Sequence, residues 1–171
     1  SNQSANELIR FIQDSQNCIA EEDLGGISEL FSGHKATWQG EGINLIHNPE
    51  RRDVGKIYTP YDVTQYMCSK IVKRLISKAD NVDQLLKMRV LDPAVGSGAF
   101  CSQFVRMLWK SARRKWKLSD ENEFRVKVCE NMLHACDIDE QALQLSKVVM
   151  WISAGCPDEH LSLNFSSLSF H

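Results

Sequence analysis

The chain has 171 residues, which suits one domain with a sizeable core, and its apolar (43%) and charged (25%) fractions are those of an ordinary globular protein. No apolar run approaches the length of a membrane span and the N-terminus is polar, so we expect no membrane partner. The formal net charge of −2 excludes a basic footprint over the whole domain. Any contact with nucleic acid must therefore be local, or be made by other parts of the protein.

The cysteines are not arranged for disulfides or metal. None of the six forms a C-x-x-C pair, and no Cys/His cluster has zinc spacing. We therefore expect free thiols in a reducing compartment, a cytoplasmic protein and no metal site. The six are Cys18, Cys68, Cys101, Cys129, Cys136 and Cys156.

The first 50 residues are expected to form a helical extension and loop, separate from a second unit over residues 51–171. Residues 6–31 predict two short helices around a Gly-Gly pair, because their apolar residues keep rough helical spacing. Residues 32–55 are rich in Gly, Asn, Pro and charge, which predicts a loop with one short strand.

The next stretch, residues 57–79, predicts an amphipathic helix. Thr59 is a good N-cap, Pro60 suits the first helical position, and Asp62 completes a spacing similar to a capping box. Apolar residues four apart define one face of this helix: Val63, Met67, Ile71 and Leu75.

Strands and helices then alternate. In chain order we expect a short buried strand at 87–91, helices at 99–117 and 119–133, a strand at 133–138, a helix at 139–155 that stops at Gly155, and a strand at 160–168. The helical residues expected to face inward are Phe100, Phe104, Leu108, Phe124, Val128, Ala142, Leu145, Val149 and Ile152. In the last strand Leu161, Leu163 and Phe165 alternate with polar residues. This order predicts an α/β fold with a parallel sheet and helices on its faces, in which ligands bind beyond the carboxyl ends of the strands.

The stretch DPAVGSGAF, residues 92–100, follows the first of these strands. Gly96 and Gly98 allow a sharp turn and close approach to a ligand, and the helix beginning near residue 99 offers free N–H groups there. A dinucleotide fingerprint fits poorly, since Cys101 replaces its third glycine and the next strand-end acid, Asp137, lies 39 residues after Gly98. A phosphate-binding G-x-x-x-x-G-K-[ST] loop is absent. A plain turn remains an alternative, although it would not need Asp92.

Acids follow the next strand at the same predicted edge of the sheet. A carboxylate at Asp137 can accept hydrogen bonds from both hydroxyls of a ribose. Alone, Asp137 and Asp139 are better explained as acids at a helix N-terminus. Together with the glycine turn, Asp137 predicts a site for a ribose and an amino acid. The Thr59-Pro60 helix start could hold a carboxylate, or be only an N-cap.

Three segments, GKIYTPYDV (55–63), VLDPAVGSGAF (90–100) and ENMLHACDIDEQALQLSKVVMWISA (130–154), resemble consecutive signatures of N6-adenine DNA methyltransferases from type I and type IIG restriction–modification systems. The resemblance runs from about residue 55 to the end of the chain. It implies a Rossmann-like fold that binds S-adenosyl-L-methionine, truncated here and carrying a helical N-terminal extension. It also implies methyl transfer to adenine N6 of double-stranded DNA, with a specificity or nuclease subunit or domain as a possible partner.

The resemblance assigns roles to individual residues. Tyr58, Thr59 and Pro60 would close over the methionine end of the cofactor. Asp137 would bind the ribose hydroxyls, and Ile138 would pack on the adenine. The residues that would line the methionine and ribose are Asp92, Ala94, Gly96, Ser97 and Gly98, with Asp92 directed at the amine. Val95 stands where the family often has cysteine.

The family's catalytic motif, [DNS]-P-P-[YF], is absent from the sequence. The four prolines, Pro49, Pro60, Pro93 and Pro157, are nowhere adjacent. No catalytic residue is therefore assigned, and we expect a chain cut before its catalytic loop, inactive by itself, whose coding sequence continues past His171. Two alternatives stay open: a non-catalytic scaffold module that binds S-adenosylmethionine, and an RNA or protein methyltransferase of the same fold, against which the YTP segment argues.

One basic segment could touch phosphates. RMLWKSARRKWK, residues 106–117, carries six cations and two tryptophans. A solvated helix face is the more frequent explanation of such a charge run.

Overall fold

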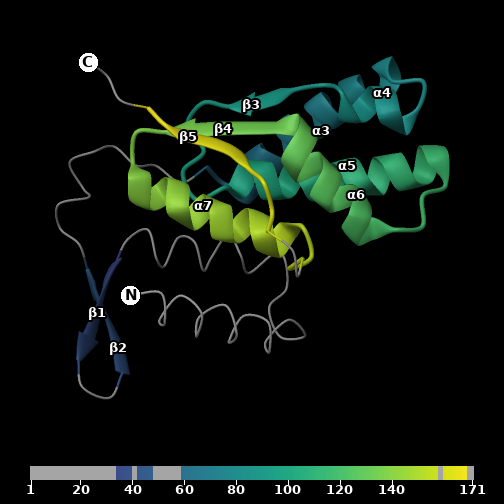
Figure 1. Cartoon of the computed structure of the whole chain (residues 1–171). Helices are drawn as coiled ribbons and strands as arrows, with labels where there is room; N and C mark the ends of the chain where they lie inside the picture. The colour runs from purple at the N-terminus through teal and green to yellow at the C-terminus, as the bar shows by residue number, and fades with distance from the viewer. Residues whose placement is uncertain (1–33, 40–41, 48–58, 158–159, 169–171) are drawn as a thin grey trace.

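The computed structural model describes residues 34–39, 42–47, 59–157 and 160–168 (Figure 1). The helices expected at 6–31, the domain boundary near residue 50 and Tyr58 lie outside the described residues.

A β-hairpin occupies part of the segment expected to be a loop with one strand. Strand β1 (His34–Gln39) pairs antiparallel with β2 (Gly42–His47), from His34 opposite His47 to Gln39 opposite Gly42. The expectation of one strand was therefore wrong. The sequence of β1, HKATWQ, has little apolar alternation and does not by itself predict a strand. Its hydrogen-bonded pairing with β2 makes it one.

The other strands form the parallel sheet that the alternation predicts. Strands β3 (Val90–Asp92), β4 (Leu133–Asp137) and β5 (Asn164–Ser167) lie in the order β3-β4-β5. Asp92 pairs with Ala135, and Asp137 with Ser167, so the carboxyl ends of the strands meet at one edge. The architecture is α/β and compatible with a Rossmann-like fold.

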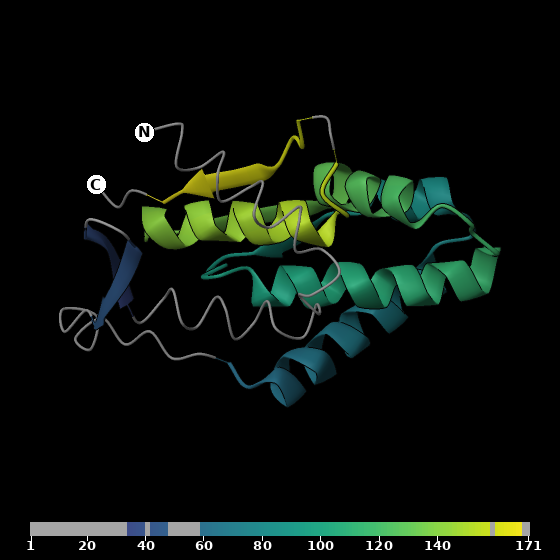
Figure 2. The same cartoon turned by 90° about the horizontal axis from the view of Figure 1, so that it is seen from below.

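Helices α3 (Tyr61–Lys78), α5 (Ala99–Trp116) and α7 (Glu140–Ser153) lie in a row, with α7 and α5 against the sheet and α3 outside α5 (Figures 1 and 2). Helix α4 (Val82–Leu86), which the sequence pattern did not predict, connects α3 to β3. Helix α6 (Glu121–Lys127) continues into a π-helix, η2 (Val128–Met132), so the helix expected at 119–133 exists with a change of pitch. None of the helices in these ranges is long and apolar enough to cross a membrane.

The core lies between the sheet and this helical layer. Leu133, Ala135 and Phe165 point from the strands toward the helices and are buried. Leu108 of α5 and Met150 of α7 are fully buried against them. On the opposite face of β3, Leu91 is 63% exposed.

Helix α3 is rotated from the orientation its apolar pattern predicts. Val63, Met67 and Ile71 are between 40% and 46% exposed, and of the expected row Leu75 alone packs against the core, partly buried. The neighbouring row, Thr64, Cys68 and Val72, is buried against α5 instead. Adjacent residues lie about 100° apart around a helix, so the row one position along faces the core. The small Thr64 and Cys68 side chains allow α3 to approach α5 closely.

The start of α3 also differs from the expected capping. Pro60 occupies the N-cap position, and no side chain caps the helix. The Pro60 carbonyl accepts hydrogen bonds from the Val63 and Thr64 N–H groups and the Thr64 hydroxyl. Thr59 was therefore wrongly predicted as the cap, because a proline at the N-cap shifts the first helical residue to Tyr61.

Helix α7 is rotated in a similar way. Val149 is buried as expected, but Ala142, Leu145 and Ile152 are only partly buried. The buried residues of this segment are Leu143, Ser146, Val149, Met150, Ser153 and Ala154. The prediction of inward residues was more accurate elsewhere: Phe104, Leu108, Phe124 and Val128 are buried, and Phe100 is partly buried.

The rotation of α3 can be tested by trimming adjacent residues. Val72→Ala, at a residue 3% exposed, should lower the free energy of unfolding by about 2 kcal/mol, because two buried methyl groups are removed and a cavity remains. Ile71→Ala, at a residue 40% exposed, is the matched control and should cost less than half as much. Urea unfolding measures both, and a larger loss for Ile71→Ala would contradict this orientation.

Candidate functional site

The glycine turn, residues 93–98, joins β3 to α5 at the carboxyl edge of the sheet. Gly96 has φ +53° and Gly98 has φ +88°, conformations that L side chains rarely adopt. The Gly98 N–H donates to the Val95 carbonyl (2.8 Å), and the Gly98 carbonyl accepts the Ser102 N–H (2.9 Å) as α5 begins. The turn therefore carries the chain directly from strand to helix.

The two glycines have different surroundings. Among the described residues, a Cβ atom at Gly96 would meet nothing within 4 Å, so none of their side chains fills this position. A Cβ atom at Gly98 would lie 3.3 Å from the Cα and Cβ atoms of Ser146 on α7. Gly98 is thus required by helix packing, whereas Gly96 leaves room beside the backbone.

Asp137 at the end of β4 holds the turn in place. One carboxylate oxygen accepts the Gly96 N–H (2.7 Å), and the other accepts the Asp139 N–H (2.8 Å). The Val95 N–H adds a bond to the Cys136 carbonyl (3.0 Å). Each carboxylate oxygen has a second lone pair, so Asp137 can accept further hydrogen bonds.

Asp92 is the second carboxylate of the site. Its oxygens accept the Ala94 N–H (3.2 Å) and the Cys101 thiol, whose sulfur lies 3.9 Å away. Burial raises the pKa of Asp92 above its ordinary value of 3.8; the two hydrogen bonds oppose this rise, and the nearby charge of Asp137 adds to it. The site thus concentrates two carboxylates at adjacent strand ends, an arrangement that favours a cation.

Three residues that the sequence analysis did not assign support these groups. Burial raises the pKa of the Cys101 thiol well above its ordinary value, so it stays protonated and can donate to Asp92. The Cys136 thiol donates to the Pro93 carbonyl (3.5 Å), and Ser146 lies beneath Gly98. Cys101 and Ser146 are buried, whereas Cys136 is partly buried, and sequence periodicity does not indicate what any of them contacts.

The other predicted site residues are less closely joined to the turn. Ile138, directly after Asp137, is 60% exposed and presents apolar surface beside the carboxylate. Ala94 is exposed and Ser97 half-buried, both within the turn. No hydrogen bond among the described residues connects Thr59 or Pro60 to the turn. The Cys68 thiol of α3 does donate to the Phe100 carbonyl (3.5 Å), near the start of α5. Over the same part of the chain no group of three His, Cys, Asp or Glu side chains could hold a metal ion.

Comparison with known proteins places this geometry in context. No protein-family model matches the chain. Over 65% of the chain, it is 23% identical to a Methanocaldococcus jannaschii protein named "Putative type II restriction enzyme and methyltransferase RM.MjaORFECS2P", of which the match covers 13%. The name of this distant relative describes a restriction enzyme and methyltransferase, and it specifies neither the base that is methylated nor the methyl donor.

Substituting the two glycines separates their roles. Gly96→Ala should cost about 1–2 kcal/mol of stability, the strain of a left-handed conformation for alanine. Gly98→Ala should cost more, because the same strain is joined by contact with Ser146. Chemical denaturation of both variants gives the comparison. Equal losses would mean that α7 does not pack on Gly98.

The raised pKa of Asp92 predicts a pH-dependent stability. Because the folded chain holds this proton more tightly than the unfolded chain, ionisation of Asp92 destabilises the fold at neutral pH, and the penalty disappears as pH falls below about 3.8. Asp92→Asn, which keeps the side-chain shape, should therefore melt at or above the wild-type temperature at pH 7. The difference should shrink toward pH 4. A difference in melting temperature that does not change with pH would contradict the raised pKa.

Proposed function

We propose that the site at the carboxyl edge of the sheet binds S-adenosyl-L-methionine, and that the chain is the cofactor-binding part of an N6-adenine DNA methyltransferase from a restriction–modification system. The observation that carries the proposal is the pair of carboxylates, Asp92 and Asp137, at the ends of neighbouring parallel strands and joined through the glycine turn. The name of the distant relative agrees with methyl transfer.

The chemistry of the residues fits this cofactor. S-adenosylmethionine combines cationic groups, a ribose diol and an adenine ring. Asp137 has unused lone pairs for the diol, and Ile138 offers exposed apolar surface for the ring. Asp92 supplies negative charge for the amine, and the open side of Gly96 lets a ligand approach the backbone. A ligand rich in phosphates would instead face two carboxylates.

The remaining predicted residues have supporting roles in this proposal. Ala94, Ser97 and Gly98 line the methionine and ribose as parts of the turn. Tyr58, Thr59 and Pro60 close over the methionine end from the start of α3. Because α3 packs on α5, movement of the start of α3 would be transmitted through α5 to the glycine turn that precedes it.

Bound S-adenosylmethionine would supply an electrophilic methyl group on its sulfonium, the chemistry that methylation of an adenine amine needs. The residues of this chain would position that cofactor and exclude competing nucleotides. The flipped adenine would be held by another part of the protein, since no motif in this chain combines an acceptor for its amine with a stacking ring. Double-stranded DNA and a specificity or nuclease subunit or domain are the partners we propose for the whole protein, acting in the cytoplasm.

Calorimetry with S-adenosylmethionine and its demethylated product tests the cofactor. Asp92→Asn should weaken binding of S-adenosylmethionine by about tenfold or more, because a charge-assisted hydrogen bond of about 1.5–3 kcal/mol is removed while the side-chain shape stays. Asp137→Ala should weaken both ligands to a similar degree, since both carry the ribose.

The control is Asp83→Asn, an exposed acid in the first turn of α4 with the same change of charge, which should bind as the wild type does. ATP and NAD serve as competing ligands. Binding of either with an affinity equal to that of S-adenosylmethionine, or no loss in the Asp92 and Asp137 variants, would overturn the proposed site.

A further inference from the structure

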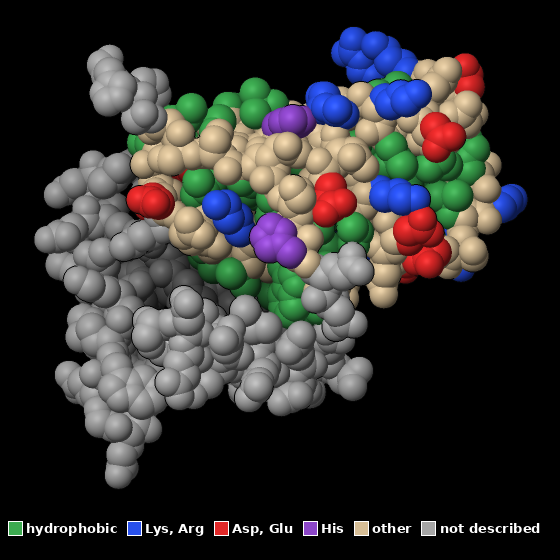
Figure 3. Space-filling view, in the orientation of Figure 1, with side chains coloured by type: hydrophobic (Ala, Val, Ile, Leu, Met, Phe, Trp, Pro, Cys, Tyr) green, Lys and Arg blue, Asp and Glu red, His purple; other side chains and the backbone are tan. Residues whose placement is uncertain are grey.

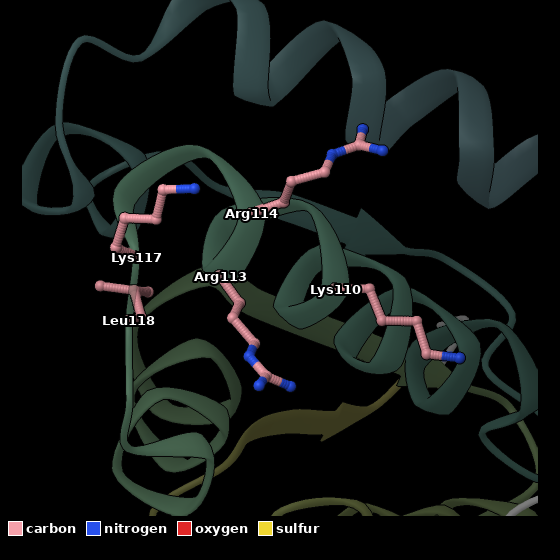
Figure 4. A pocket seen from close by; sticks show the side chains of 5 residues that line it. All are labelled: Lys110, Arg113, Arg114, Lys117 and Leu118. Atoms are coloured by element: carbon pink, nitrogen blue, oxygen red, sulfur yellow. The ribbon is translucent and has the colours of Figure 1, made fainter.

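The C-terminal end of α5 carries a set of cations far from the cofactor site. Lys110, Arg113, Arg114 and Lys117, with Leu118, line a shallow surface hollow of about 400 Å³ (Figure 4). At 1.5 Å per residue the hollow begins about 16 Å along α5 from the glycine turn and ends about 27 Å from it. These cations therefore have no part in binding the cofactor.

The structure divides the basic segment 106–117 into two groups. Arg106 bonds to Tyr61 and Gln103, and Trp109 is buried. Lys115 donates to the carbonyls of Ile76 and Ala79 (both 2.7 Å), and the Trp116 indole donates to the Asp80 carbonyl (3.1 Å). Arg106 thus joins α5 to the start of α3, and Lys115 and Trp116 join it to the end of α3. The cations that line the hollow form the second group, and none has a hydrogen-bonded or ion-pair side-chain partner within the described part of the chain.

Within the described residues, the nearest acids along the chain form no ion pair with the cations of the hollow. Asp120 accepts the Glu123 N–H as the N-cap of α6. Glu121 pairs with Arg125, and Glu123 pairs with Lys127, one turn further along the same helix. Glu121 and Glu123 are therefore paired within α6, whereas Asp120 caps the helix and keeps its negative charge. In Figure 3 lysine and arginine side chains gather, with acidic side chains among them, at the end occupied by α4 and α6 in Figure 1.

The arrangement of the cations fits an extended anion. Figure 4 shows Arg114 and Lys117 extending to one side of the hollow, and Lys110 and Arg113 to the other. They frame the hollow and do not converge on one point, as a site for a single small anion would require. Lys110 and Lys117 are seven residues apart, about 10 Å along the helix, so the four cations spread over more length than a single small anion spans.

We propose that this hollow, the four cations of α5 and Leu118, is a docking surface for the phosphate backbone of double-stranded DNA. The choice of DNA rests on the proposed function, and the charge and spacing of the surface are independent of it. The surface holds the duplex at a distance from the base that is modified, so it contributes affinity and orientation without touching the reacting atoms. A net charge of −2 is compatible with this role because the cations are concentrated at one end of a single helix.

The test uses the whole 171-residue chain and a 20-base-pair duplex of mixed sequence at low salt. Replacing all four cations by glutamine should weaken binding at least tenfold. The salt dependence of log K should become shallower by about 0.9 for each phosphate that the variant no longer neutralises. The matched control replaces four exposed cations of α3 and α4, Lys73, Arg74, Lys78 and Lys87, by glutamine, with the same change of net charge. It should change the affinity less than threefold.

A second variant separates charge from folding. Arg113→Lys with Arg114→Lys keeps all four charges and should bind DNA nearly as well as the wild type. Equal losses of affinity in the glutamine variant and its control would overturn the surface, as would no binding by the wild type. Polyglutamate that competes as well as DNA would identify an acidic protein segment as the partner instead. Binding of S-adenosylmethionine should be unchanged in every variant, so a failure of the proposed cofactor site is seen separately.

Discussion

The carboxylate of Asp137 is the constraint on which the rest of the site depends. It accepts the N–H groups of Gly96 and Asp139, and so fixes the turn after β3 to the end of β4. Parallel strands do not join directly, and their carboxyl ends become a site only where something sets the loops beyond them in register. Here a single side chain does so, and the bond from the Val95 N–H to the Cys136 carbonyl reinforces it.

This constraint gives Asp137 two tasks that a substitution can confuse. Removing the carboxylate removes a ribose acceptor and also releases the Gly96 N–H, so the loss of binding contains a structural part. Asp92 is better suited to isolate the effect of charge, because asparagine can keep the bond from the Ala94 N–H. Burial raises the pKa of Asp92, so its ionised carboxylate destabilises the site, and a substitution of Asp92 also changes that stability.

The sequence predicts most of the architecture but not the orientation of its helices. Alternating strands and helices, and acids after strands, are local signals, and β3, β4 and β5 appear where expected within a few residues. The inward face of α3 is decided by its partner: both the apolar row through Met67 and the row through Cys68 repeat every four residues, and only the second lets α3 lie close to α5. Cys101 and Ser146 were unpredictable as site residues for the same reason, since their importance comes from contacts distant in sequence.

Helix α5 separates the two charged surfaces of the chain. The N-terminus of α5 lies beside Asp92 and Asp137, and its C-terminal part carries the four cations of the hollow. The helix dipole favours negative charge at the first end and positive charge at the second. Eighteen residues span about 27 Å, roughly three times the Debye length at physiological ionic strength. The cations therefore do not neutralise the carboxylates. A cationic ligand at one end and a polyanion at the other can thus bind the same helix without competing.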